Sequence, residues 1–207
     1  MAEILDLTKV LDKDLPIYTT GTYSDPPLQI ETWCTVQQQG YAVSRISMGT
    51  QTGTHIDAPA HFASDGATLE ALPVQALIGR YLWVDLCHVT EADLGKVTSG
   101  YEGESILFLT SSDPAKTEAS EEVLSALLKL PCIVWVTVYG VQVIGHDLLY
   151  FHQALSAAGR YLIEDVDEVT ASRAIPGGEM IALPLRLAGI SGSPCRVVVV
   201  QGLKRDE

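Results

Sequence analysis

The sequence predicts a mixed α+β fold dominated by strands, and three features of its pattern predict this class. Most apolar runs are short and rich in β-branched residues, as strands are. Gly and Pro, at 17 and 10 of 207 residues, interrupt these runs at short intervals. A few segments instead carry apolar residues at helical spacing. We expect a single domain over residues 1–207, long enough to bury a sizeable core, with 9–27 as an extended N-terminal arm.

The first half of the chain is expected to form short strands separated by turns. Gln37 to Gly40 separates two β-branched and aromatic runs, which predicts a hairpin. Pro73 suits the first turn of a short helix that ends before Gly79. The expected elements are strands over 4–7, 28–36, 41–48, 80–86 and 105–110, a helix over 70–78, and a short helix or turn over 91–94.

The second half is expected to alternate helices with strands. Ser120, followed by Glu121 and Glu122, is a good helix start, because a hydroxyl and early carboxylates satisfy free amide groups. The β-branched run 132–138 indicates a strand covered on both faces, and strand, helix and strand in succession predict parallel pairing. The expected elements are a helix from 121 to Pro131, an extension of the preceding strand over 141–144, a helix over 147–158, and strands over 161–166, 180–185 and 196–201.

Composition excludes several classes of partner. The chain has 13 Lys and Arg against 26 Asp and Glu, a formal charge of −13, which argues against nucleic acid or an anionic membrane and leaves a small molecule as the expected partner. The four cysteines form no Cys-x-x-Cys pair and indicate free thiols in a reducing compartment. With no signal-peptide pattern and no apolar stretch of membrane-spanning length, we expect a soluble cytoplasmic protein.

The segment 50–62 concentrates the polar groups that carry chemistry. If it is extended, Gln51, Gly53, His55, Asp57 and His61 share one face, since side chains alternate along a strand. A glycine on that face leaves room for a ligand to approach the backbone. Two imidazoles and a carboxylate are ligands that suit Zn²⁺ or Mn²⁺. The segment therefore predicts a metal or catalytic site.

A second polar pair lies much later in the chain. Glu164 sits in an apolar run and would share a strand face with Leu162 and Val166, so its carboxylate needs a cation, a donor or a proton. Taken alone, either residue of this pair could have a purely structural role. His152 could cap a helix, and Glu164 could pair with a nearby arginine.

These residues also carry a resemblance to a known family. The run Gln-Thr-Gly-Thr-His-Ile-Asp-Ala-Pro-Ala-His resembles the signature of the cyclase family, which includes bacterial kynurenine formamidases and isatin hydrolases, usually His-x-Gly-Thr-His-x-Asp-x-Pro-x-His. Gln51 replaces the first metal-ligating histidine of that pattern. The family also places a helical His 12 residues before a strand Glu, and His152 and Glu164 have this spacing, 164 − 152 = 12. The tail Ile-Ala-Leu-Pro-Leu-Arg-Leu-Ala-Gly is similar too, so the resemblance covers nearly the whole chain.

The resemblance implies a fold, an activity and a set of site residues. The implied fold is the swivelling β/β/α architecture. The implied activity is metal-dependent hydrolysis of a C–N bond in a small aryl formamide or cyclic amide, with one or two Zn or Mn ions. Gln51 offers only an amide, a weaker donor than imidazole, which favours one ion or Mn²⁺. The implied metal ligands are Gln51, His55, Asp57, His152 and Glu164, with His61 as acid/base and Tyr18 as a substrate contact.

Two other functions stay open at this point. The same metal could act as a Lewis acid in a non-hydrolytic cyclase or dehydratase of a biosynthetic pathway. The chain could instead be a metal-free, degenerate binding protein, although a site released from chemistry has no physical reason to keep so many polar groups together. The arm 9–27 suggests packing on a neighbouring subunit, so we expect a homodimer or a higher homo-oligomer.

Overall fold

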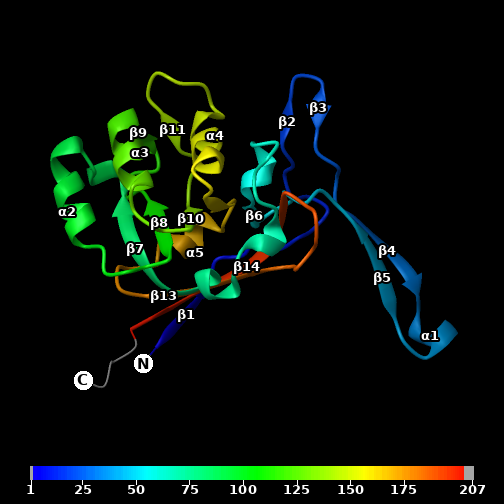
Figure 1. Ribbon diagram of the computed structural model, residues 1–207. Coiled ribbons are helices and arrows are strands. Elements are labelled where there is room, and N and C mark those ends of the chain that lie inside the picture. Colours follow the sequence, from blue (N-terminus) through cyan, green and yellow to red (C-terminus); the bar gives the residue numbers. More distant parts are fainter. Residues whose placement is uncertain (1, 203–207) are drawn as a thin grey trace.

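A sheet that closes on itself organises the computed structural model, which describes residues 2–202 (Figure 1). Strand β6 pairs with β14 as well as with β12, and this pairing completes the ring while β1 stays outside it. Within the described residues the order across the sheet is β1 (Glu3–Asp6), β14 (Gly192–Gln201), β13 (Glu179–Pro184), β7 (Ile78–Asp85), β8 (Ile106–Thr110), β10 (Val134–Thr137), β12 (Tyr161–Glu164) and β6 (His55–Asp57).

The sheet is mixed, and its parallel part matches the sequence prediction. Strands β7, β8, β10 and β12 run parallel to one another, whereas β6, β13 and β14 join antiparallel. Parallel neighbours need long crossovers, and helices supply them here. The predicted class, α+β with strands dominant, is confirmed.

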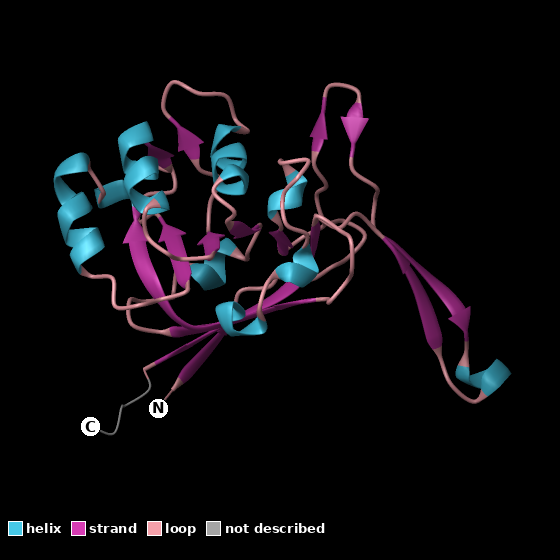
Figure 2. Ribbon diagram, viewed as in Figure 1, coloured by secondary structure: helices cyan, strands magenta, loops and turns pink. Residues whose placement is uncertain are grey.

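Both faces of β8 and β10 are buried, which explains their unbroken apolar runs. Ile106 and Phe108 of β8 belong to the core inside the ring, while Leu107 and Leu109 belong to a second core beneath the helices. This alternation follows from the two-residue period of a strand. The helices that cover the outer face are α2 (Leu94–Ser99), α3 (Glu121–Leu128) and α4 (Tyr150–Ala157), all on one side of the sheet in Figure 2.

Three helix ends have the caps that their sequences favour. The Ser120 hydroxyl accepts a hydrogen bond from the amide of Val123, as expected for an N-cap. Helix α4 ends before Gly159, whose φ of +68° is the left-handed conformation that glycine adopts freely. The short helix α5 (Glu168–Ala171) begins at Asp167, whose carboxylate accepts from the amide of Thr170.

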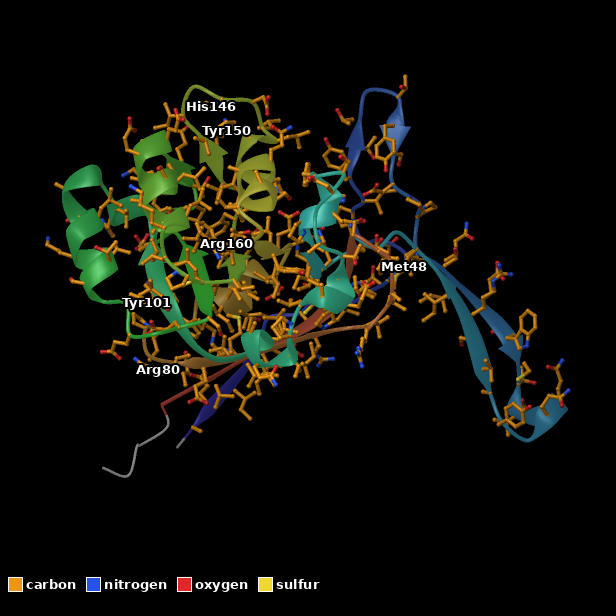
Figure 3. The ribbon with its side chains drawn as sticks, in the orientation of Figure 1. Met48, Arg80, Tyr101, His146, Tyr150 and Arg160 are labelled. Carbon is orange, nitrogen blue, oxygen red and sulfur yellow. The ribbon has the colours of Figure 1, made fainter. Side chains whose placement is uncertain are left out.

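Two hairpins extend from the closed sheet. The predicted hairpin is confirmed as β4 (Gln29–Cys34) and β5 (Val43–Ser47), joined by α1 (Val36–Gln39), and it points away from the body, which it meets beside Met48 (Figures 1 and 3). A smaller hairpin, β2 (Thr19–Thr20) and β3 (Tyr23–Ser24), lies within the arm. The larger hairpin exposes apolar side chains, each by at least 42%: Ile30, Trp33, Val36, Tyr41, Val43 and Ile46.

Two predicted elements are wrong. The helix expected over 70–78 is instead two 3-10 turns, η2 (Leu69–Ala71) and η3 (Val74–Leu77), because Pro73 takes an extended ψ of 136° and separates them. The extension expected over 141–144 is instead β11 (Gln142–Val143), which leaves the main sheet and pairs with β9 (Glu118–Ala119). The remaining 3-10 helices are η1 (Pro59–His61), η4 (Leu86–His88) and η5 (Glu91–Asp93).

The cysteines and the helix lengths of the described residues can be compared with the predictions from composition. Cys34, Cys87, Cys132 and Cys195 are free thiols, the last two buried. Across residues 2–202, every helix is too short or too polar to cross a membrane.

Candidate metal centre

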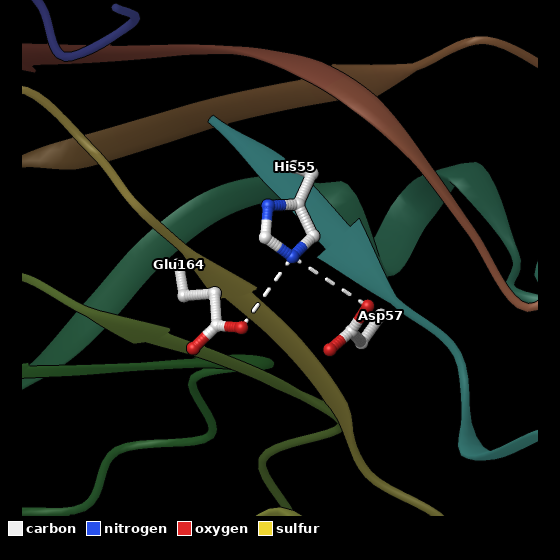
Figure 4. A group of neighbouring side chains, drawn as sticks. All are labelled: His55, Asp57 and Glu164. Atoms are coloured by element: carbon white, nitrogen blue, oxygen red, sulfur yellow. Dashed lines mark ion pairs between the residues drawn. The ribbon is translucent and has the colours of Figure 1, made fainter. Parts of the chain in front are cut away.

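The register between two strands brings the central groups of the site together. His55 on β6 lies directly opposite Glu164 on β12, and opposite residues of an antiparallel pair share a face. Asp57 lies two residues beyond His55, so it points to that same face. One imidazole nitrogen and one oxygen of each carboxylate lie within 4.8 Å of one another (Figure 4). These side chains therefore form a compact group of three ligand types.

The hydrogen bonds of His55 define its protonation. Its Nδ1 lies 2.7 Å from the carbonyl oxygen of Gly53, and because a carbonyl only accepts, Nδ1 carries a proton. Its Nε2 lies 3.6 Å from Oδ1 of Asp57 and 3.4 Å from Oε1 of Glu164. A nitrogen lone pair facing two carboxylate oxygens is repelled by them. A cation, either a proton or a metal ion, is needed between these three atoms.

The pKa values of the group reflect this need. Burial alone would lower the pKa of His55, but the hydrogen bond to Glu164 and the charge of Asp57 raise it to about 9. Burial raises the pKa of Asp57, which the charge of His55 offsets only in part. Burial would likewise raise the pKa of Glu164, but hydrogen bonds from His152 and His55 lower it. Without a metal ion, a proton on His55 provides the positive charge.

His152 contacts the group from helix α4. Its Nε2 lies 3.1 Å from Oε2 of Glu164, so the two oxygens of Glu164 face two different imidazoles. The ring of Phe62 lies against it with centroids 5.3 Å apart. Its Nδ1 is buried without a hydrogen-bond partner among the described residues. The spacing of His152 and Glu164 thus corresponds to a direct contact.

Gln51 and His61 approach the group from irregular backbone. The segment 50–62 is extended only over β6, so the common face expected for all four polar residues holds for His55 and Asp57 alone. Gln51 lies in the turn before β6 and His61 in η1, where Pro59 starts a 3-10 turn. The Gln51 amide nitrogen nevertheless lies 3.3 Å from Oδ1 of Asp57 and 3.5 Å from Nδ1 of His61.

A cavity of about 370 Å³ opens over Gln51, His55 and Glu164. The arm supplies one wall through Pro16, Ile17 and Tyr18, and the substrate contact that the resemblance implies for Tyr18 stays a prediction. Asp57 and His152 instead line a much smaller space, about 10 Å³, that Phe62 also borders. The group therefore faces a cavity large enough for a small molecule on the side of His55 and Glu164.

Sequence reasoning missed several residues of this cavity. Tyr139, Asp165 and Glu168 are among the other residues that line it. Tyr139 follows the carboxyl end of β10, a usual place for ligand contacts beside parallel strands, and that was the available signal. Asp165 has a φ of +57°, uncommon outside glycine, and its side chain pairs with Lys9 of the arm.

Gly53 serves the arm and not a ligand. Its φ is +66°, and an added Cβ would lie 2.6 Å from Leu11 and 3.0 Å from Leu15. The prediction that Gly53 leaves room for a ligand is therefore wrong, because two leucine side chains fill that space. The missing side chain instead lets the arm pack on the turn that leads into β6.

Comparisons with known proteins show the family to which the chain belongs. The family model Cyclase, described as Putative cyclase, matches residues 5–153. The chain belongs to the cyclase family. A curated relative, kynurenine formamidase from Bacillus cereus, is 29% identical over 210 residues, which cover 96% of this chain and 97% of the relative.

Solved structures similar to the cyclase-family chain share its fold. Isatin hydrolase A from Labrenzia aggregata superposes with a TM-score of 0.72 at 20% identity, over 96% of this chain and 93% of that protein. A protein from Bacillus stearothermophilus, described as a predicted metal-dependent hydrolase, superposes with a TM-score of 0.70 at 25% identity, over 97% and 98%. The fold predicted by the resemblance is therefore confirmed.

Proposed function

We propose that this protein is a metal-dependent hydrolase that cleaves the C–N bond of a small aryl formamide or cyclic amide. The observation that carries the proposal is the compact group of His55, Asp57 and Glu164, of which His55 and Glu164 line a cavity of about 370 Å³. Membership of the cyclase family supports it, as do relatives named kynurenine formamidase and isatin hydrolase. A buried group that needs a cation, beside a cavity, is what a metal-dependent hydrolase requires.

The donor set fits a first-row divalent ion. His55, Asp57 and Glu164 would hold it, because a proton on Nδ1 of His55 leaves Nε2 free to bind. His152, on the second oxygen of Glu164, would serve the same ion or a second one. Imidazole with carboxylate suits Zn²⁺ or Mn²⁺, and both remain part of the proposal. When bound, the ion supplies Lewis-acid polarisation of a carbonyl group and acidification of water.

The remaining residues of the site would handle the substrate and its proton. His61 is exposed and lies beside the group, with its Nδ1 3.5 Å from the Gln51 amide nitrogen, so it would move a proton to the leaving nitrogen. Tyr18 and Tyr139 give the cavity aromatic walls, which suit an aryl ring. Hydrolysis adds water across the C–N bond and yields an amine and a carboxylate.

The test combines metal analysis with a labelled product. Protein purified without added metal would be analysed for bound ions, stripped with a chelator, reloaded with Zn²⁺ or Mn²⁺, and assayed on N-formyl arylamines and cyclic amides in oxygen-18 water. We expect activity to follow metal content and one labelled oxygen in the carboxylate product. A product without label would favour the cyclase or dehydratase. Absence of both retained metal and turnover would favour the metal-free binding protein.

A further inference from the structure

The side chain of Gln51 has a defined orientation. Its oxygen accepts a hydrogen bond from the Thr50 hydroxyl at 2.6 Å, and its nitrogen faces Asp57 at 3.3 Å. A hydroxyl can either donate or accept, whereas an ionised carboxylate only accepts. Asp57 therefore decides the orientation, because an amide oxygen turned toward it would be repelled. The atom of Gln51 that faces the metal ligands is a donor without a lone pair to offer.

The same nitrogen also faces His61. Its distance to Nδ1 of His61 is 3.5 Å, and an amide nitrogen can only donate. The neutral His61 ring must then accept at Nδ1 and carry its proton on Nε2. The second amide hydrogen points to Asp57, so one side chain connects a residue of the metal group with the exposed histidine.

A glycine in the closed sheet leaves space for the Gln51 amide. Gly192, at the start of β14, lies opposite Asp57 in the register of β6 and β14. A Cβ added to Gly192 would collide with Nε2 of Gln51 and would lie 3.2 Å from Oδ1 of Asp57. The absence of a side chain at Gly192 thus gives the amide nitrogen its position against the carboxylate.

We propose that Gln51 is a positioning residue for His61 and not a metal ligand, and that it holds the neutral His61 ring with its proton on Nε2. This inference rests on the proposed function, because the Nε2–H is the hydrogen-bond donor that His61 would direct at the leaving nitrogen. A proton that the ring passes to that nitrogen is replaced from the attacking water, so the ring ends neutral. It differs from the ligand role that the resemblance implies for position 51. An imidazole with the opposite tautomer would have no ring proton on Nε2 to donate.

Nitrogen-15 NMR of histidine-labelled protein tests the tautomer with no substrate present. In the wild type, both metal-free and Zn²⁺-loaded, we expect His61 to show an unprotonated Nδ1 and a protonated Nε2. Gln51→Leu should remove this bias. Gln51→Glu, of equal size but unable to donate, should place a proton on Nδ1. Gln37→Leu, an exposed glutamine on the distant hairpin, is the matched control and should leave the His61 signals unchanged.

Metal binding and kinetics complete the test. Calorimetric titration should give the same Zn²⁺ stoichiometry and affinity for Gln51→Leu as for the wild type. On any substrate the wild type turns over, kcat should fall about 10- to 100-fold, the usual cost of losing an orienting partner, with KM little changed. Weaker Zn²⁺ binding by Gln51→Leu, or an unaltered His61 spectrum in both variants, would overturn the inference. A wild type inactive on every amide would refute the proposed function and leave these two readouts intact.

Discussion

The candidate site has two halves that are built differently. His55, Asp57 and Glu164 lie on paired strands, and the side chains of the first two are each 6% exposed. Gln51 and His61 lie in a turn and a 3-10 helix, and His61 is exposed. Strand register fixes the first half from two sides, whereas the second depends on side-chain hydrogen bonds of Gln51 to Thr50, Asp57 and His61, at 2.6, 3.3 and 3.5 Å. The fold thus holds His55, Asp57 and Glu164 more firmly than Gln51 and His61, and it leaves His61 open to solvent.

The largest effect should come from a substitution in the strand-built half, which consists of His55, Asp57 and Glu164. His55→Ala removes the only imidazole nitrogen that faces both carboxylates within the described residues, so the buried Asp57 and the partly buried Glu164 lose their common partner. We expect metal affinity to fall by more than about 100-fold, since even an outer orienting partner costs 10- to 100-fold, and activity to be lost. Metal analysis after dialysis measures this. Unchanged metal stoichiometry in His55→Ala would contradict the assignment.

Breaking the turn-built half should leave the metal in place. His61→Ala should lower kcat by about 10²- to 10⁴-fold, the range for losing a general acid or base, with metal content as in the wild type. Steady-state kinetics beside metal analysis checks both statements. Wild-type turnover would mean that His61 is only structural.

Protonation of His55, in the strand-built half, should make the stability of the metal-free protein depend on pH. The folded-state pKa of His55, about 9, lies above its ordinary 6.5, so its contribution to the metal-free protein is complete below pH 6.5 and is lost as the pH rises through 9. By linkage the loss is a few kcal/mol, roughly 3. Urea unfolding across this range measures it, with His55→Gln as the control that lacks it. A Zn²⁺-loaded protein should not show this loss, because the ion takes the proton's place on Nε2.

The smallest effect should come from the hairpin of β4 and β5, far from either half. Trp33 is 70% exposed, so Trp33→Ser should change the free energy of unfolding by less than about 0.5 kcal/mol. The homo-oligomer expected from the sequence stays a prediction, and Trp33→Ser tests whether the hairpin lies in its subunit interface. We expect Trp33→Ser to weaken self-association in sedimentation experiments, while Leu148→Ser, 77% exposed on the body, does not. If Trp33→Ser and Leu148→Ser self-associate to the same extent, the hairpin does not lie in a subunit interface.

Much of the fold followed from local pattern. The β-branched run 132–138 predicted a strand covered on both faces, and all four residues of β10 are buried. Ser120 predicted a helix start because a cap depends on neighbouring residues only. The helix over 70–78 failed for the opposite reason, since apolar spacing gave no sign that the ψ of Pro73 would separate two turns.

For the site, the sequence by itself predicted the residues that meet, because the types and short spacings of His55 with Asp57 and of His152 with Glu164 are local properties. Only the tertiary structure decided how they meet. Closure of the sheet pairs β6 with β12 and β14, which sets Glu164 opposite His55 and Gly192 opposite Asp57. The orientation of the Gln51 amide was equally beyond the sequence. It depends on a carboxylate, a hydroxyl and a missing side chain that meet only when the sheet closes, since pairing register is a property of distant segments.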